Sequence, residues 1–594
     1  MHDPRAILGA RLLQRRAAVA GWERRDARIA FLRLVAFAAV AAVAVLSLAL
    51  HRLSAWWLLA PGASFLALVV WHDRTLRGLA RARRAVAFHE EGLARLDGSW
   101  AGRGDGGERY GSDDHPYAKD LDLFGKGSVY ELLCTARTRP GADLLAAWLL
   151  APSAVSEVRA RQGAVRDLAP RLDLREDLAV LGEDVRAELH PDRLAAWAEA
   201  PRVLPGWLVV PALAAGALAL AALVGWFAGE VPGLAVVGIA GLEWLVLRAA
   251  QRRLAGVLGG VERPGEELLL VAGILARLER EPLEDPRLRA LLGTLGEGHG
   301  AASARIHHLG LVVERAGWAA NQLFAPIAFL LLWRVQAALA IERWRAAHGR
   351  QVRPWLAAAA ELEALSALGA HAFLHPEDAF PELLDGAGGA KLAAEGIGHP
   401  LLDESRCVRN DIALARGARL LLVSGSNMSG KSTLLRTVGA NAVLALAGAP
   451  VRARRLALTP LQAGATLRIQ DSLAEGRSRF YAEITRLRAL LELAGRPPPL
   501  LFLLDELLAG TNSRDRRIGA EAMLRALLAR GAIGIVTTHD LALSEAAAAL
   551  GEAENAHFED EVRGGEVVFD YRLRPGVVTH SNALALMRAV GLEV

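Results

Sequence analysis

The chain has 594 residues, of which 53% are hydrophobic, and its formal net charge is only +4. A chain of this length exceeds what one hydrophobic core normally serves, so we expect several domains. The small net charge provides no global field that would attract nucleic acid. The two cysteines, Cys134 and Cys407, are too few and too far apart for a disulfide framework or a metal cluster.

The N-terminal region combines a basic segment with two apolar blocks. Arginines from Arg5 to Arg28 precede the first block, whereas a cleavable signal peptide would place its apolar stretch nearer the start. Residues 34–50 and 53–71 are apolar almost throughout, and at about 1.5 Å per helical residue each can cross, or nearly cross, a hydrocarbon layer of about 30 Å. Residues 1–100 are therefore interpreted as a basic segment with a transmembrane hairpin. Residues 101–119, rich in Gly, Ser and Asp, are interpreted as a linker.

Residues 120–397 are predicted to form a mainly helical region that contains a second apolar pair. Apolar residues recur at helical spacing in segments such as 266–278 and 355–374. Residues 203–227 and 231–247 surround a short tip, and we expect them to form a second transmembrane hairpin. A shorter apolar block at residues 323–333 is predicted to be a core helix.

Charged and aromatic residues orient both hairpins. Arginine-rich segments lie at the hairpin bases, whereas the tips carry almost no positive charge. The positive-inside rule then predicts a multi-pass protein of the inner (cytoplasmic) membrane with every large segment on the cytoplasmic side. The block ends carry tryptophans of the kind found at membrane interfaces: Trp56, Trp57, Trp71, Trp207, Trp226 and Trp244. The alternative is that the blocks are buried core helices of a large soluble protein, and Glu243, inside the fourth block, weighs most in that choice.

An apolar run at residues 420–424 leads into a glycine-rich segment that matches the pattern GxxxxGK[ST]: Gly425, Ser426, Asn427, Met428, Ser429, Gly430, Lys431 and Ser432, followed by Thr433. A strand before this segment and a helix after it are the context that a phosphate-binding loop requires. Gly425 and Gly430 allow backbone N–H groups to curl around phosphate oxygens at the helix N-terminus. Lys431 is expected to act on the β- and γ-phosphates of ATP, and Ser432 to ligate Mg²⁺.

Two further apolar strands supply the remaining groups of a nucleotide site. Residues 500–504 have the pattern of a buried parallel strand and end in Asp505 and Glu506. We expect Asp505 to hold Mg²⁺ through water and Glu506 to polarise the attacking water. A third strand, residues 533–536, leads to His539, which is expected to sense the γ-phosphate; the alternative is a structural histidine at a strand end. Together the three strand ends describe the core of an α/β ABC-type P-loop ATPase.

These motifs resemble those of the MutS mismatch-repair ATPase family. Residues 426–432 are similar to the family's P-loop, residues 476–483 to its signature segment, residues 505–513 to its Walker B and D-loop, and residues 571–592 to its C-terminal helix region. The resemblance predicts a MutS-type ATPase domain over residues 398–594. A weaker similarity around residues 121–152 implies that residues 120–397 form a mostly α-helical, MutS-like core and lever region.

The resemblance implies a homodimer with two composite ATP sites. Ser478 would reach the γ-phosphate of the nucleotide bound to the partner subunit, and Asn512 would lie at the dimer seam. The chain departs from the family pattern at the residue expected to stack on the adenine base. Cys407 occupies this position, where the family has an aromatic residue. Tyr571 is the alternative stacking residue, from the other side of the base.

The resemblance also predicts a function, with some features missing. Phe88-His89-Glu90 matches the Phe-x-Glu wedge of mismatch readers, but its basic, helix-like surroundings indicate a chance match, and no Lys/Arg-rich DNA clamp is evident. We therefore predict a membrane-associated MutS-like ATPase that binds duplex or branched DNA and is related to mismatch repair or recombination, with mismatch reading in the usual manner doubtful. The alternatives are an ABC-type transporter, disfavoured because no LSGGQ-type segment precedes residue 500, and a membrane scaffold ATPase that does not act on DNA.

Overall fold

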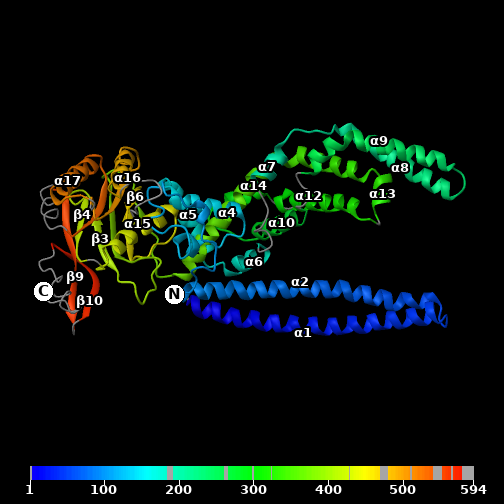
Figure 1. The fold of residues 1–594 in the computed structure, drawn as a ribbon, viewed down its shortest axis with the longest axis horizontal. Coiled ribbons are helices and arrows are strands. Elements are labelled where there is room, and N and C mark those ends of the chain that lie inside the picture. Colours follow the sequence, from blue (N-terminus) through cyan, green and yellow to red (C-terminus); the bar gives the residue numbers. More distant parts are fainter. Residues whose placement is uncertain are drawn as a thin grey trace.

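Two long helical hairpins and a pair of β-sheets lie at opposite ends of an elongated molecule in the computed structural model (Figure 1). The structure describes residues 3–182, 191–259, 265–296, 300–322, 324–426, 428–467, 479–508, 511–539, 551–563 and 566–577. In these residues the N-terminal half is almost entirely helical, and every strand follows residue 381. Mixed α/β structure is thus confined to the C-terminal region, which we call the head.

The first hairpin consists of α1 (Pro4–Ala44) and α2 (Leu59–Leu96), with a π-helical turn (Val45–Ala49) and a 3₁₀ turn (Ala55–Leu58) at its tip. Its helices pack side by side along their whole length (Figure 1). His89 of the Phe88-His89-Glu90 segment is fully buried in α2 and lies 3.0 Å from the carboxylate of Glu176. This segment therefore packs the hairpin onto the middle of the molecule.

The middle region is a helical array that includes the second hairpin. The hairpin is α8 (Val209–Phe227) and α9 (Gly233–Leu258), preceded by a 3₁₀ turn (Gly206–Leu208). The other helices are α3 (Val129–Leu133), α4 (Arg139–Leu150), α5 (Val155–Leu168), α6 (Leu172–Gly182), α7 (Pro191–Glu199), α10 (Gly265–Glu279), α11 (Pro286–Leu295) and α12 (Ala302–Gly317). The helical interpretation of residues 266–278 is thus confirmed by α10.

The four apolar blocks are helical, and they are not core helices of this single chain. Within the described ranges, four helical segments are long and apolar enough to cross a membrane, and the buried share of their apolar windows is 6%, 0%, 22% and 6%. Both hairpin tips point toward the end of the molecule farthest from the head (Figure 1). By length and composition alone, the blocks satisfy what a membrane-spanning helix requires.

The prediction of a core helix at residues 323–333 is wrong. Its described residues contain the short helix α13 (Ala325–Leu330), which follows a 3₁₀ turn (Trp318–Ala320) and buries Ala328, and the first residue of the next helix, Trp333. Ile327 is 50% exposed. Helix α13 lies against α8, α9 and α14. Leu332, just after it, is buried in the main core.

Helix α14 (Trp333–Leu374) joins the distal end to the head. Its 42 residues make a helix about 63 Å long at about 1.5 Å per residue. It packs against α4, α5, α7, α11 and α12. Its C-terminal half confirms the helix expected at residues 355–374 and is largely buried.

The head contains two sheets. A four-stranded sheet has the order β1-β5-β2-β3, from β1 (Glu382–Leu383), β2 (Leu392–Ile397), β3 (Asn410–Leu414) and β5 (Arg455–Leu458). A six-stranded sheet has the order β10-β9-β4-β8-β7-β6, from β4 (Leu420–Ser424), β6 (Gln462–Thr466), β7 (Leu500–Asp505), β8 (Ile533–Thr538), β9 (Ala553–Arg563) and β10 (Glu566–Pro575). The predicted boundary at residue 398 lies inside the smaller sheet, between β2 and β3.

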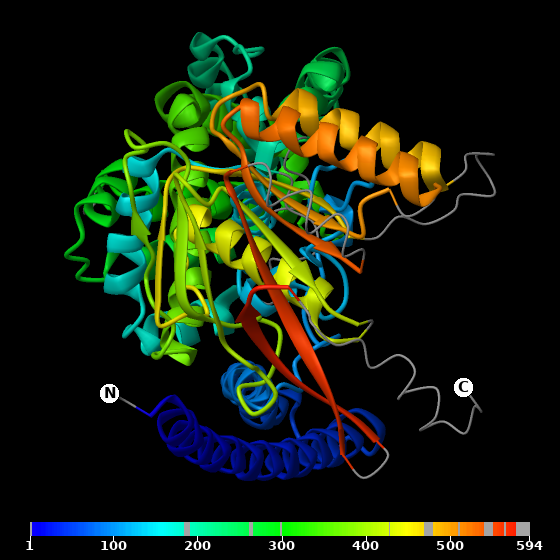
Figure 2. The same cartoon turned by 90° about the vertical axis from the view of Figure 1, so that its left-hand side faces the viewer.

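Alternation along the strands of the large sheet sends side chains to two different cores. Leu421, Val423, Leu501 and Leu503 face α15 (Lys431–Ala447) in the core that continues into the helical region. Their neighbours Leu420, Leu422, Leu500 and Phe502 face the opposite side, with α16 (Arg479–Leu493) and α17 (Ser513–Ala529). Figure 2 shows α16 and α17 side by side over that outer face. Both faces of the central strands are therefore covered, as expected for a parallel sheet.

The segment before α3 is a loop that packs against the head. Residues 101–119 contain one 3₁₀ turn (Glu108–Tyr110), and Tyr117 and Ala118 at the end of the segment are buried. Asp120 follows and accepts hydrogen bonds from the backbone N–H of Leu467 at 2.8 Å and from Arg486 at 3.2 Å. The loop thus fixes the helical region to β6 and α16.

Candidate nucleotide site

The ends of three neighbouring strands meet at one edge of the large sheet. Strand β8 lies between β4 and β7, and all three run parallel. Their register places Ser424 beside Thr538 and Thr537 beside Asp505. Groups that follow these strands in sequence are consequently brought to the same edge, where ligands of open α/β sheets bind.

The P-loop connects β4 to α15 and closes around the side chain of Lys431. The Lys431 ammonium donates to the carbonyl oxygens of Gly425 and Ser426, both at 2.8 Å. Gly430 has φ +102°, a left-handed conformation that favours glycine, and a Cβ there would lie 3.0 Å from the Tyr571 ring. Burial lowers the pKa of Lys431, and the nearby carboxylates Glu506 and Asp505 oppose that effect.

A hydroxyl and a carboxylate face each other at the start of α15. The Ser432 hydroxyl donates to Asp505 Oδ2 at 2.6 Å. The other oxygen of Asp505 accepts a short hydrogen bond from the Thr537 hydroxyl. Sequence reasoning missed this role of Thr537, although its position at the end of the adjacent strand was the available signal. The carboxylate is thus held by β8 while one oxygen points to the P-loop.

Glu506 and His539 lie beyond the ends of β7 and β8. The Glu506 backbone N–H donates to the carbonyl and to the hydroxyl of Thr537, both at 3.2 Å. Glu506 has φ +49°, a sparsely populated conformation for a non-glycine residue that concentrates at functional sites. His539 is exposed, with Nδ1 3.6 Å from Glu506 Oε1. Of the predicted catalytic groups, Lys431 and Glu506 line one cavity, and His539 lies beside Glu506.

A cavity of about 860 Å³ extends from the P-loop toward β3 and β10. Its lining includes Met428, Gly430, Lys431, Ser432, Thr433 and Glu506 from the P-loop side, and also Arg406, Val408, Asn410, Phe558 and Tyr571. The Tyr571 ring lies close to Gly430. Tyr571 has φ +55° and lies in β10, so its predicted place in a C-terminal helix region is wrong.

Asn410, which sequence reasoning did not single out, holds the backbone around Tyr571. Its amide nitrogen donates to the Tyr571 carbonyl at 3.0 Å, and its amide oxygen accepts from the Leu573 N–H at 2.8 Å. Asn410 lies three residues after Cys407, the position at which the family has an aromatic residue. Cys407 is absent from the cavity lining, whereas its neighbours Arg406 and Val408 contribute to it.

The remaining predicted site residues lie elsewhere or outside the described residues. Asn512 caps α17, because its side-chain oxygen accepts from the Asp515 N–H at 2.9 Å. It does not line the nucleotide cavity, and its predicted place at a dimer seam stays a prediction. Asn427 and Ser478 lie outside the described residues.

The residues around the cavity fit ATP with Mg²⁺. Among the described residues, the buried Ser429 hydroxyl inside the P-loop has no hydrogen-bond partner, and an additional acceptor or donor in the loop would satisfy it. Ser432 and Asp505 supply the hydroxyl and carboxylate oxygens that Mg²⁺ prefers. The cavity volume also lies within the roughly 300–1,000 Å³ typical of small-molecule sites.

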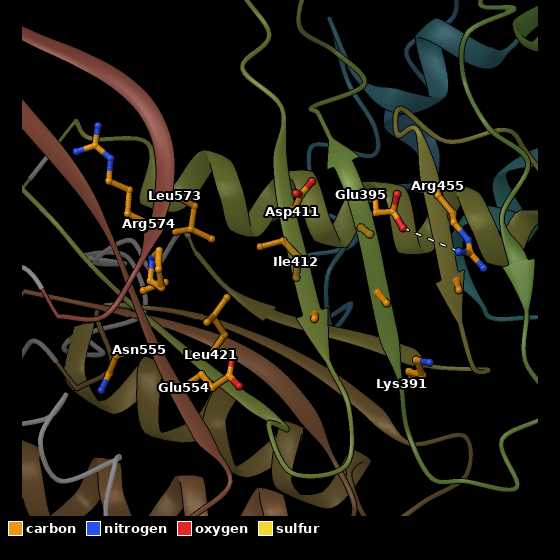
Figure 3. Close-up of a pocket in the computed structure, with 16 residues that line it drawn as sticks. Lys391, Glu395, Asp411, Ile412, Leu421, Arg455, Glu554, Asn555, Leu573 and Arg574 are labelled. Atoms are coloured by element: carbon orange, nitrogen blue, oxygen red, sulfur yellow. Dashed lines mark ion pairs between the residues drawn. The ribbon is translucent and has the colours of Figure 1, made fainter.

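A second cavity lies between the two sheets of the head (Figure 3) and has none of these features. Its volume is about 620 Å³, and Lys391, Glu395, Asp411, Arg455 and Arg574 are among its charged lining residues. Arg455 pairs with Glu395 at 3.9 Å and with Glu382 at 3.0 Å, and Arg574 pairs with Asp570 at 2.8 Å. Arg455, Glu395 and Arg574 therefore already have partners within the protein, and no P-loop residue lines this cavity.

The order of the strands, the P-loop after β4 and the carboxylates Asp505 and Glu506 at the end of β7 are the features of a P-loop nucleotide-binding domain. Residues 421–593 match the family model of MutS domain V. Over this region the chain is similar to the last domain of MutS-family proteins.

Several relatives match the same third of the chain. Endonuclease MutS2 of Thermus thermophilus is 36% identical over 195 residues, which are 33% of this chain and 25% of that protein. DNA mismatch repair protein MutS of Natronomonas pharaonis is 36% identical over 204 residues, 33% of this chain and 23% of that protein. Endonuclease MutS2 of Thermomicrobium roseum is 33% identical over 231 residues, 36% of this chain and 28% of that protein. The chain spans about a quarter of the length of the relatives it matches.

Proposed function

We propose that this chain hydrolyses ATP as a homodimer, is anchored in a membrane by its two hairpins, and couples the nucleotide cycle to DNA. The observation that carries the proposal is the cluster of Lys431, Ser432, Asp505, Glu506 and His539 at the ends of adjacent strands. Relatives in the same family imply ATP hydrolysis for the matched region.

Each residue of the cluster has a proposed task. Lys431 contacts phosphate oxygens, and Ser432 and Asp505 hold Mg²⁺, whose positive charge offsets the charge that develops during phosphoryl transfer. Glu506 accepts a proton from the attacking water. His539, which faces Glu506, contacts the γ-phosphate. Asn427, Ser478 and Asn512 are retained as nucleotide-binding or dimer-seam residues on the strength of the family resemblance, and Tyr571 as the residue that stacks on the adenine.

Membrane anchoring is supported by the position and exposure of the apolar helices. Trp56, Trp57, Trp207 and Phe227 are 78%, 64%, 69% and 77% exposed, which water would disfavour and an interfacial or lipid environment would favour. Glu243 is 2% exposed and so does not face outward, as expected for an ionisable residue within a membrane-spanning helix. With the arginine-rich bases on the cytoplasmic side, the head would lie in the cytoplasm, under an inner (cytoplasmic) membrane.

DNA is proposed as a partner because relatives carry the names DNA mismatch repair protein and endonuclease. The test is ATP turnover by the purified full chain in detergent, with homoduplex, mismatched or branched DNA added. Stimulation by at least one of these DNAs is expected. Turnover that is unchanged by all of them would overturn the DNA part of the proposal and leave a protein or lipid partner. The comparisons give no support to an ABC transporter.

A further inference from the structure

A groove lies where the second hairpin meets α12 and α14. Its apolar lining comes from Val209 and Leu213 of α8, Val312 of α12, and Ala337, Leu339 and Ala340 of α14. We call it the α8–α12–α14 groove. Its volume is about 220 Å³, below the roughly 300–1,000 Å³ of pockets that enclose a whole small molecule. A ligand in it would therefore be only partly enclosed.

Two arginines on facing helices line the same groove. Arg315 comes from the last turn of α12 and Arg343 from α14. Both side chains are exposed, and among the described residues neither guanidinium has an ion-pair or hydrogen-bond partner. Two unpaired guanidinium groups beside an apolar groove are complementary to an anion that carries an apolar chain, and guanidinium favours phosphate in particular.

The groove also lies at the depth where a lipid headgroup would sit if the hairpins span a membrane. Val209 and Leu213 are in the first turns of α8, just after the exposed Trp207. On the other wall, the indole N–H of Trp333 donates to the Arg315 carbonyl at 2.7 Å, and the Trp333 ring is stacked with Trp318 at 6.4 Å. Tryptophans of this kind mark the boundary between hydrocarbon and water.

We propose that the α8–α12–α14 groove binds an anionic phospholipid, with its phosphate between Arg315 and Arg343 and the upper part of an acyl chain along the apolar wall. This inference rests on the proposed membrane anchoring. Basic pockets between membrane helices on the cytoplasmic side are suited to such headgroups, and each arginine near an anionic surface contributes about 1 kcal/mol.

The experiment uses the full chain in nanodiscs made of phosphatidylcholine alone or of phosphatidylcholine with phosphatidylglycerol. Detergent then releases the protein from the nanodiscs, and native mass spectrometry measures which lipid stays bound to it. The wild type is expected to retain phosphatidylglycerol selectively. The double variant Arg315→Gln/Arg343→Gln should retain it roughly thirty-fold less, because two such contributions are lost. The exposed arginines Arg289 and Arg350, which do not line the groove, give the matched control Arg289→Gln/Arg350→Gln, which should behave as wild type.

A third variant, Ala337→Phe, fills the groove without a change of charge and should also reduce retention. Equal retention of phosphatidylglycerol by wild type and by Arg315→Gln/Arg343→Gln, or no preference over phosphatidylcholine, overturns the lipid site while leaving the anchoring intact. Failure of the wild type to enter phosphatidylcholine nanodiscs at all would instead overturn the anchoring. Loss of retention in the Arg289→Gln/Arg350→Gln control would show general surface attraction and also overturn the specific site.

Discussion

The head and the distal hairpins differ in how their sequence relates to their role. In the head, each polar residue of interest follows a buried strand, and parallel pairing of β4, β8 and β7 brings Ser432, Asp505 and Glu506 together within the chain. In the hairpins, length and apolar composition specify helices, but their exposed faces have no partner among the residues that the structure describes. In the head, the fold brings the residues of several motifs together into one site. The apolar surface of the hairpins shows only that something must cover it, without showing what.

The largest effect is expected in the head, from Glu506→Gln. Removal of the proposed general base should lower ATP turnover by about 10²–10⁴-fold, while ATP binding persists because Lys431 and the P-loop are unchanged. Single-turnover phosphate release and nucleotide binding measure the two separately. Glu492→Gln, on the exposed face of α16, is the control. Equal turnover in Glu506→Gln and wild type would remove Glu506 from the mechanism.

At the distal end, arginine substitutions distinguish lipid from water around the second hairpin. Leu218 and Val237 are 60% and 68% exposed, so Leu218→Arg and Val237→Arg would cost little in water but about 2.5–3.5 kcal/mol each at a bilayer centre. The readout is an impermeant maleimide added to intact cells, reacting at the tip through Glu230→Cys in a Cys134→Ala/Cys407→Ala background. Labelling should occur and should fall when both arginines are introduced.

The matched control for this experiment is Leu13→Arg. Leu13 is 69% exposed but lies in α1 before the apolar block, so its substitution should leave tip labelling unchanged. Absence of labelling in the parent chain would contradict the proposed crossing.

The joint between α14 and the head should make stability depend on pH. His375 Nδ1 lies 3.2 Å from the Arg452 guanidinium, which also pairs with Asp378 at 3.1 Å. Burial, and then the charge of Arg452, lower the pKa of His375 to about 3. The pKa of His375 is lower in the folded protein than in the unfolded chain, so neutral His375 contributes to the free energy of unfolding. That contribution is complete above about pH 6.5 and is lost as the pH falls toward 3. At pH 5 the loss is about 2 kcal/mol.

The variant His375→Asn keeps an acceptor for Arg452 but cannot titrate. Its thermal unfolding midpoint should therefore fall less than that of the wild type between about pH 7 and pH 5. The exposed His307→Asn serves as control. Identical pH dependence in His375→Asn and wild type would show that another group dominates.

The smallest effect is expected at Tyr571, the residue proposed to stack on the adenine. Tyr571→Ala should weaken ATP affinity by roughly 1–3 kcal/mol, the usual contribution of an aromatic ring stacked on a base. Tyr571→Phe retains the ring and should bind nearly as well. Isothermal titration with a non-hydrolysable ATP analogue compares the two. Equal, weakened binding in both variants would point to the hydroxyl and contradict stacking.

Much of the head could be predicted from the sequence, because each motif indicates where a strand ends and a loop or helix begins. Lys431, Asp505 and His539 each follow an apolar strand, and parallel pairing then leaves little freedom in where their side chains lie. The sequence did not predict the Thr537–Asp505 hydrogen bond, the hold of Asn410 on Tyr571, or the capping role of Asn512. These contacts depend on which strands become neighbours and on the exact register, neither of which a motif encodes.

Away from the head, the helices were predictable from their periodicity, but their surroundings were not. Residues 323–333 have the composition of a core helix, yet Ile327 is 50% exposed and α13 has only six residues. Hydrophobicity indicates that a surface will be covered; whether protein or lipid covers it depends on the rest of the fold. The apolar lining of the α8–α12–α14 groove similarly emerges only when three separate helices meet.

The most direct test of the nucleotide site replaces Mg²⁺ by Mn²⁺ and records the ³¹P couplings of ATP by electron–nuclear double resonance on the purified full chain. The Ser432 hydroxyl and Asp505 Oδ2 lie 2.6 Å apart, so we expect both to bind the metal. Protein-bound Mn²⁺ should then show phosphate couplings distinct from those of free Mn–ATP, and this signal should be lost in Asp505→Asn. A spectrum identical to free Mn–ATP, unchanged by Asp505→Asn, would contradict a metal–nucleotide site at the ends of these strands.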